Sequence, residues 1–208
     1  MTVDWQALVK LTIFDPKQAA EKIMALRRNL SHAMLWSMVV LVAALMALSI
    51  WLSWQVFPPM PSPDPEVLAF QQRMARFVAR PALLAVLFAG SIVLAINILH
   101  WAGRLLGGEG ELHDMAAVFL WLQVLQTSAM VLILLLALVS APLAGLIEFA
   151  ISLLGLWILV AFVDRVHGFG NPLKAVGTLL LGPAMLFAIM VVVLVLLGAG
   201  AEGGMGNV

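Results

Sequence analysis

Most side chains of this sequence that could take part in chemistry gather in one short polar stretch, residues 100–119. There His113 lies close to Glu109, Glu111 and Asp114, and carboxylate oxygens beside an imidazole can hold a divalent cation. No spacing among these residues is diagnostic of a metal site, and acidic side chains also favour the positive end of a new helix. We therefore interpret them as a solvated acidic turn, and we expect no metal and no other cofactor.

No arrangement typical of an enzyme is present in the sequence. Cysteine is absent, which excludes thiol catalysis, disulfides and cysteine metal sites. There is no His-Glu-x-x-His, Gly-x-Ser-x-Gly or P-loop motif, and the paired glutamates of membrane prenyl proteases are missing as well. The formal net charge is zero, so the chain lacks the basic field that nucleic-acid binding requires. We predict a protein that is not an enzyme and binds no nucleic acid.

A second set of polar residues lies inside long apolar runs, where each polar group is costly in lipid and must face a partner. This candidate intramembrane polar site comprises Asn97, His100, Gln123, Gln126 and Glu148. Two interpretations stay open: a path for protons or substrate, and hydrogen bonds between helices that contribute about 0.6 kcal/mol each. The structural interpretation is favoured for the set as a whole, whereas the two are nearly balanced for Glu148, the only acid well inside a run.

The apolar runs themselves are long enough to cross a bilayer. Hydrophobic residues make up 63% of the chain and charged residues 11%, whereas a soluble domain has about half and about a quarter. We predict an all-α polytopic membrane protein built as a bundle of five transmembrane helices. The predicted membrane domain covers 33–198, with spans at 33–57, 82–103, 115–139, 143–163 and 173–198, and a flexible tail follows over 199–208.

Residues 1–32 precede the spans and are mixed in polarity. Asp15 followed by Pro16 is typical of a helix start, with the aspartate as N-cap and the proline as the first helical residue. Beyond them the apolar residues fall on one helical face, which predicts a cytoplasmic amphipathic segment. This helix either lies in the membrane interface with its basic residues reaching the headgroups, or packs on the ends of the spans. The sequence does not favour one of these two alternatives over the other.

The connections between the predicted spans are short, apart from residues 58–80. That segment opens with prolines that favour extended geometry, and it continues from Glu66 as a helix whose three arginines we expect to contact headgroups. The glycine-rich turn after the second span can end one helix, and Asp114 is a candidate cap for the next. The candidate interaction hairpin in this turn comprises Arg104, Gly107, Gly108 and Gly110.

The distribution of Lys and Arg predicts the orientation. If the N-terminus is cytoplasmic, eight of these residues lie on that side, and only Arg73, Arg76 and Arg80 lie on the other. We therefore predict that the N-terminus is in the cytoplasm, and five spans then place the C-terminus outside.

Three features together resemble the YIP domain family of membrane proteins, which interact with Ypt/Rab GTPases. They are Phe14-Asp15-Pro16-Lys17 before the amphipathic helix, Gly107-Gly108-Glu109-Gly110 between the second and third spans, and Trp157 followed by Val166-His167-Gly168-Phe169 at the exit from the fourth. The resemblance implies a compact bacterial-type member in the inner membrane. Because the long cytosolic extension of Golgi members is missing, a Rab-type GTPase is not expected as a partner.

The role that this resemblance implies is membrane shaping, or scaffolding as an adaptor, through the amphipathic helix and the hairpin. The expected partners are membrane lipids, together with a protein partner or a second copy of the chain. The alternative is a small transporter or lipid-translocating protein. It would use an intramembrane polar path around Glu148 and the kink that Pro183 imposes on the fifth span.

Overall fold

The structure, a computed structural model, describes residues 4–202, and within that range its regular elements are all α-helices. In chain order they are α1 (Trp5–Phe14), α2 (Pro16–Arg27), α3 (His32–Val56), α4 (Pro65–Val78), α5 (Pro81–Leu105), α6 (Leu112–Ala137), α7 (Ala141–His167) and α8 (Pro172–Glu202). Helices α3, α5, α6, α7 and α8 are each long and apolar enough to cross a membrane. The predicted fold class, an all-α polytopic membrane protein, is therefore confirmed.

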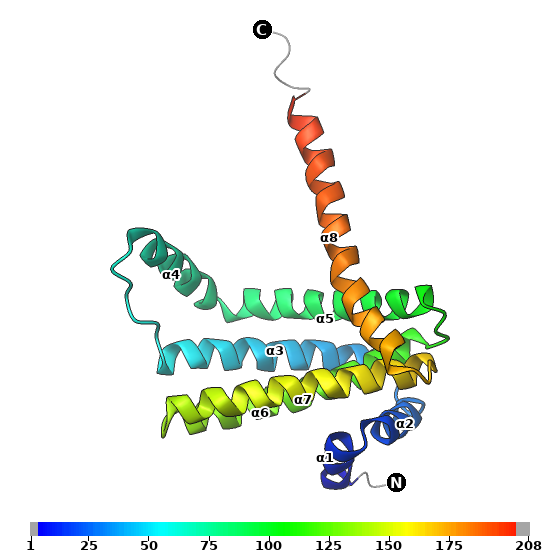
Figure 1. Cartoon of the computed structure of the whole chain (residues 1–208). Helices are drawn as coiled ribbons and strands as arrows, with labels where there is room; N and C mark the ends of the chain where they lie inside the picture. Colours follow the sequence, from blue (N-terminus) through cyan, green and yellow to red (C-terminus); the bar gives the residue numbers. More distant parts are fainter. Residues whose placement is uncertain (1–3, 203–208) are drawn as a thin grey trace.

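Four of the long helices, α3, α5, α6 and α7, lie side by side (Figure 1). α3 packs against α5 and α6, and α6 pairs with α7. Their shared core takes Val42, Ile96, Leu120 and Phe162 from the four helices, none of them more than 2% exposed. Large apolar side chains also cover the outward faces, as expected for helices whose solvent is lipid.

The fifth long helix, α8, takes a different course. It crosses α5 and α7 and then extends away from the other four (Figure 1). The crossing is close at Gly182, where an added Cβ would lie 3.0 Å from Ile98, and Pro183 follows directly inside the helix. α8 continues through Glu202, so the predicted flexible tail is helical over 199–202, and residues 203–208 lie outside the described part.

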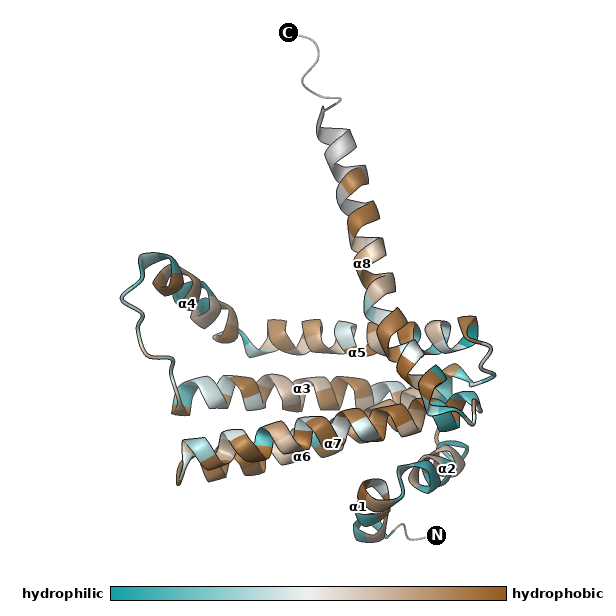
Figure 2. Cartoon of the chain, in the orientation of Figure 1, coloured by the Kyte–Doolittle hydropathy of each residue, from teal (hydrophilic) through white to brown (hydrophobic). Residues whose placement is uncertain are grey.

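The connections define two ends of this four-helix group. The α2 end carries α1 and α2 together with the α5–α6 and α7–α8 turns, and the α4 end carries α4 and the proline-rich linker (Figure 1). In Figure 2 the short helices α1, α2 and α4 mix hydrophilic and hydrophobic residues, whereas the long helices are mostly hydrophobic. The polar residues that could interact with a partner or with headgroups therefore gather at the two ends.

Local sequence signals set several helix ends. Asp15 accepts a hydrogen bond from the Gln18 amide at 3.1 Å, and Pro16 follows in the first turn of α2, which confirms the predicted start. The prediction that Asp114 caps α6 is wrong. The N-cap of α6 is Glu111, and its side chain makes no capping hydrogen bond. Asp114 lies in the first turn instead, where its charge favours the helix N-terminus and its carboxylate pairs with a cation of α2.

Candidate functional site

The apolar face of α2 packs against α6 and α7. Ala19, Ala20 and Ile23 on this face are at most 6% exposed and belong to the main apolar core. In the structure, the amphipathic helix α2 therefore packs on the ends of the spans, which was one of the two alternatives for it. Helix α1 lies beside α2, so the first helices form a layer across one end of the protein.

Lys17 and Asp164 form an ion pair that ties this layer to α7. The Lys17 Nζ lies 2.6 Å from an Asp164 carboxylate oxygen, and Asp164 is only 3% exposed. The other carboxylate oxygen accepts a hydrogen bond from the Asn171 amide at 3.0 Å. A buried charge requires such partners, because its desolvation is costly when it is left alone. The last turn of α7 is therefore tied to the first turn of α2 and to the start of α8.

Two further contacts hold the same helices together. Arg27, at the end of α2, donates from Nε to Asp114 and from Nη2 to Glu111, each at 2.8 Å. The hydrogen bond to Asp114 is the main reason that the pKa of Arg27 is raised above its ordinary value, so this residue stays charged at any pH of the cell. Glu21 pairs with Arg165. We call these contacts, with Lys17–Asp164, the clasp.

Sequence reasoning missed the clasp. The sequence predicts that the fourth span ends at residue 163, before Asp164, whereas α7 runs on to His167. One signal was present: Lys17 lies in the first turn of α2, where the helix dipole disfavours a cation. A lysine at that position indicates an acidic partner elsewhere in the chain, although it does not say which acid.

His167 packs into a cradle of three glycines, Gly103, Gly108 and Gly110. A Cβ added at Gly103 would lie 2.2 Å from its Nε2, one at Gly108 would lie 2.6 Å from its Cβ, and one at Gly110 would lie 2.8 Å from its Nδ1. The Glu109 amide also donates to the His167 carbonyl at 3.2 Å. The α5–α6 turn is therefore rich in glycine because the end of α7 occupies the space that side chains would fill.

The candidate interaction hairpin is divided by this packing. Gly108 and Gly110 are buried, whereas Arg104 and Gly107 are exposed. Gly107 has a φ of 84°, a left-handed conformation that glycine adopts without strain. Two of the four predicted residues thus shape the turn and contact α7, and two remain on the surface.

The four histidines form two separate pairs. His32 and His113 lie with their ring nitrogens 2.8 Å apart, and the rings of His100 and His167 are stacked with centroids 6.3 Å apart. His167 is 2% exposed, and neither of its ring nitrogens has a hydrogen-bond partner of good geometry within the described residues. In the acidic turn, the carboxylates of Glu111 and Asp114 both pair with Arg27, whereas His113 contacts His32.

The other intramembrane polar residues are dispersed over several helix contacts. Asn97 donates to the Val93 carbonyl of its own helix at 2.7 Å, and Gln123 contacts the Met46 sulfur of α3 at 3.6 Å. Gln126 rests on α7, where an added Cβ at Gly155 would lie 2.7 Å from its amide nitrogen. These three side chains therefore face different neighbours and do not line one common path.

Glu148 lies apart from that set, in a groove of about 350 Å³ between α3, α6 and α7 at the α4 end. The lining is apolar except for Glu148 and two serines, Ser49 and Ser53. None of Asn97, His100, Gln123 and Gln126 lines this groove. The predicted polar site is thus divided into a groove at one end and scattered contacts elsewhere.

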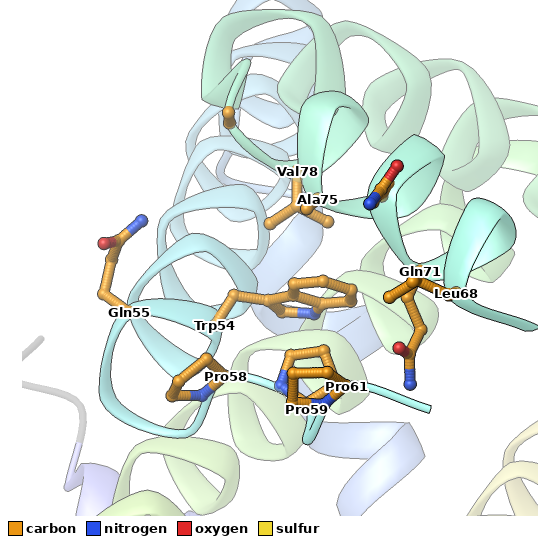
Figure 3. A pocket seen from close by; sticks show the side chains of 11 residues that line it. Trp54, Gln55, Pro58, Pro59, Pro61, Leu68, Gln71, Ala75 and Val78 are labelled. Carbon is orange, nitrogen blue, oxygen red and sulfur yellow. The ribbon is translucent and has the colours of Figure 1, made fainter. Parts of the chain in front are cut away.

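The α4 end also contains a hollow of about 400 Å³ between the end of α3, the linker and α4. Figure 3 shows the Trp54 indole with the proline rings of the linker on one side and Val78 of α4 on the other. Gln71 of α4 holds the linker backbone by accepting from the Ser62 amide at 3.2 Å and donating to the Met60 carbonyl at 3.0 Å. The proline-rich segment is thereby fixed as an extended strap.

The fold and the clasp together define a polytopic all-α membrane protein whose N-terminal helices are fastened to the ends of two spans. The family model of the Yip1 domain matches residues 10–197, nearly the whole chain. The chain therefore belongs to the Yip1 domain family, and the resemblance found in its sequence is confirmed. Neither the curated proteins nor the solved structures gave a match.

Proposed function

We propose that this member of the Yip1 domain family is a non-enzymatic scaffold or adaptor that binds partners at its α2 end. The clasp supports this proposal, because it fixes α2 on the spans through contacts with both α6 and α7. A surface fixed in this way can bind a partner without the entropic cost of ordering a loose segment. Lys22 and Arg28 are exposed on it and have no ion-pair partner within residues 4–202.

Helix α1 adds a contact with the membrane to this proposal. Trp5 stacks on Trp121 of α6 with ring centroids 5.9 Å apart, and the Trp121 indole donates to the Thr12 hydroxyl at 2.9 Å. The last two residues of α1, Ile13 and Phe14, are exposed, the latter 84%. An apolar helix face beside a span inserts into the adjoining leaflet, which supports a role in membrane shaping.

We further propose that the α2 end faces the cytoplasm of a bacterial cell and that the chain resides in the inner membrane. The positive-inside rule supports this orientation. Eight Lys and Arg residues lie on or near the α2 end, whereas Arg73, Arg76 and Arg80 lie on or directly after α4.

Single cysteines test the orientation without background, because the chain has no cysteine of its own. Glu66 and Glu109 are both exposed, and they lie at opposite ends. In intact cells, Glu66→Cys is expected to react with an impermeant thiol reagent and Glu109→Cys only after permeabilisation. Labelling of Glu109→Cys from outside would reverse the proposed orientation.

A photo-crosslinking residue at Lys22 or Arg28 tests the adaptor role in cells. We expect each to give the same discrete protein adduct, whereas a matched probe at Gln72, exposed on α4, should not give it. To test the two charges, the photo-crosslinking residue is placed at Gln18 and both charges are reversed, Lys22→Glu with Arg28→Glu. The yield of the protein adduct is then expected to fall by about tenfold. Adducts with lipid alone at both α2 positions would contradict the adaptor role.

The alternative, a small transporter, needs a path that connects Glu148 with the other intramembrane polar groups. Such a path finds no support in the described residues, because Asn97 bonds to its own helix and Gln126 rests on α7. We therefore place the scaffold before the transporter.

A further inference from the structure

His32 and His113 meet at the α2 end, although 81 residues separate them in the sequence. His32 is the first residue of α3, and His113 lies in the first turn of α6. The Nδ1 of His32 and the Nε2 of His113 lie 2.8 Å apart. His32 is exposed and His113 is half-buried, so the pair is open to ions from the solvent.

The separation of these two nitrogens is close to the one that a shared metal ion requires. Two imidazole nitrogens that bind one tetrahedral zinc ion at about 2.0–2.1 Å are roughly 3.3 Å from each other. The two ring centroids are 4.3 Å apart, whereas rings aligned end to end across such a contact would have centroids about 5 Å apart. The rings are therefore bent relative to the line between their nitrogens, and a modest rotation turns both lone pairs to one point beside that line.

The state of the rings and the neighbouring charges also favour a metal ion. A hydrogen bond between the two nitrogens needs a lone pair on one of them, so at least one ring is neutral, and neutral imidazole is the form that binds metals. The other ring can move its N–H to its second nitrogen and offer a lone pair as well. Glu111 and Asp114 share one guanidinium, that of Arg27, so these three groups together carry a net charge of −1 beside the pair.

The ligand set decides the kind of ion. No group of three or more His, Asp or Glu residues is placed to hold one ion within residues 4–202, so the pair supplies two protein ligands and water occupies the remaining positions. Imidazole ligands favour zinc, copper and nickel, whereas magnesium and calcium prefer oxygen. The pair thus fits a divalent transition metal.

We propose that the Nδ1 of His32 and the Nε2 of His113 bind one divalent transition-metal ion of the zinc type. The ion joins the start of α3 to the start of α6, and it thereby fixes the short connection between α2 and α3. The site differs from the oxygen-rich one considered in the sequence, because both protein ligands are imidazoles. This inference does not depend on the proposed adaptor role, which requires no metal.

Calorimetric titration of Zn²⁺ into the full chain, purified in detergent without a histidine tag, tests the site. We expect one tightly bound ion per chain with a Kd on the order of 10 µM, because the site has half the protein ligands of a structural zinc site. His32→Gln and His113→Gln should each raise this Kd by about tenfold or more, since only one imidazole is left. Wild-type affinity in His32→Gln would overturn the proposal.

His100→Gln is the matched control, because it removes one imidazole from the other histidine pair. It should bind zinc as the wild type does, and metal-free melting curves of all three variants show that each is folded. Loss of zinc binding in His100→Gln, with binding retained in His113→Gln, would place the ion at the other pair and contradict the site.

Electron spin-echo spectra of the chain with Cu²⁺ identify the ligands directly, because the remote nitrogen of each bound imidazole modulates the signal. The wild-type protein is expected to show two imidazoles on one copper ion. His32→Gln should show a single imidazole or no bound copper. A single imidazole in the wild type would mean an adventitious ion only, and it would refute the shared site.

Discussion

Replacing Gly103 with alanine is expected to destabilise the folded protein by roughly 3 kcal/mol, the upper part of the range for overpacking a core. The added Cβ would lie 2.2 Å from the His167 Nε2. The ring has no room to retreat, because Gly108 and Gly110 enclose it and Phe169 stacks on it with centroids 5.3 Å apart. The change is measured as a lower melting temperature of the purified protein in detergent.

Two companion variants show whether the clash with His167 is the cause. Gly90→Ala places the same methyl group in a span where nothing lies within 4 Å, so the melting temperature should not fall. In Gly103→Ala with His167→Ala, the second change removes the clashing ring, and the pair should be more stable than the sum of the two single effects predicts. If Gly103→Ala were as stable as Gly90→Ala, the cradle would not constrain the turn.

Lys17→Gln is expected to cost about 2 kcal/mol, less than the loss of one partner from a fully buried ion pair. The smaller value follows because the Lys17 side chain is 51% exposed, although Asp164 is 3% exposed. The change removes the positive charge that pairs with the buried carboxylate of Asp164. It should loosen α2 from α7, and this is measured as faster amide exchange over α1 and α2 together with a lower melting temperature.

Lys22→Gln is the matched control for this prediction, since Lys22 is exposed on the same helix. A surface change of this kind should alter stability by less than about 0.5 kcal/mol. Adding Asp164→Asn to Lys17→Gln removes the stranded charge and should restore part of the lost stability. Equal amide exchange in Lys17→Gln and Lys22→Gln would show that the clasp does not hold α2 in place.

The parts of the fold that depend on neighbouring residues could be predicted from the sequence. Hydropathy alone places the long helices, because crossing a bilayer requires about 20 apolar residues in one run. The start of α2 follows from Asp15 and Pro16, since a cap is made by residues within one turn. The break between α4 and α5 lies before Pro81, which disfavours helical geometry in the residue that precedes it.

The candidate site could be predicted only in part, because its contacts join distant segments. No residue near Lys17 in the sequence identifies Asp164 as its partner. Likewise, the glycine turn does not indicate that His167 packs against it. The spacing of the apolar residues shows that one face of α2 is apolar. This periodicity does not say whether lipid or protein covers that face. Glu148 is recognisable in the sequence as an acid inside a span, yet its neighbours Ser49 and Ser53 belong to another helix.

The clasp has a consequence for biosynthesis. Chains are made from the N-terminus, so α2 leaves the ribosome well before the acids that it will meet. Arg27 can pair with Asp114 once the start of α6 has been synthesised, whereas Lys17 must wait for the end of α7. A nascent chain that stops short of α7 therefore leaves Ala19, Ala20 and Ile23 partly uncovered. Quality-control proteases that recognise exposed apolar helices would find this mark on chains that stop short of α7 and lose it when the fourth long helix is in place.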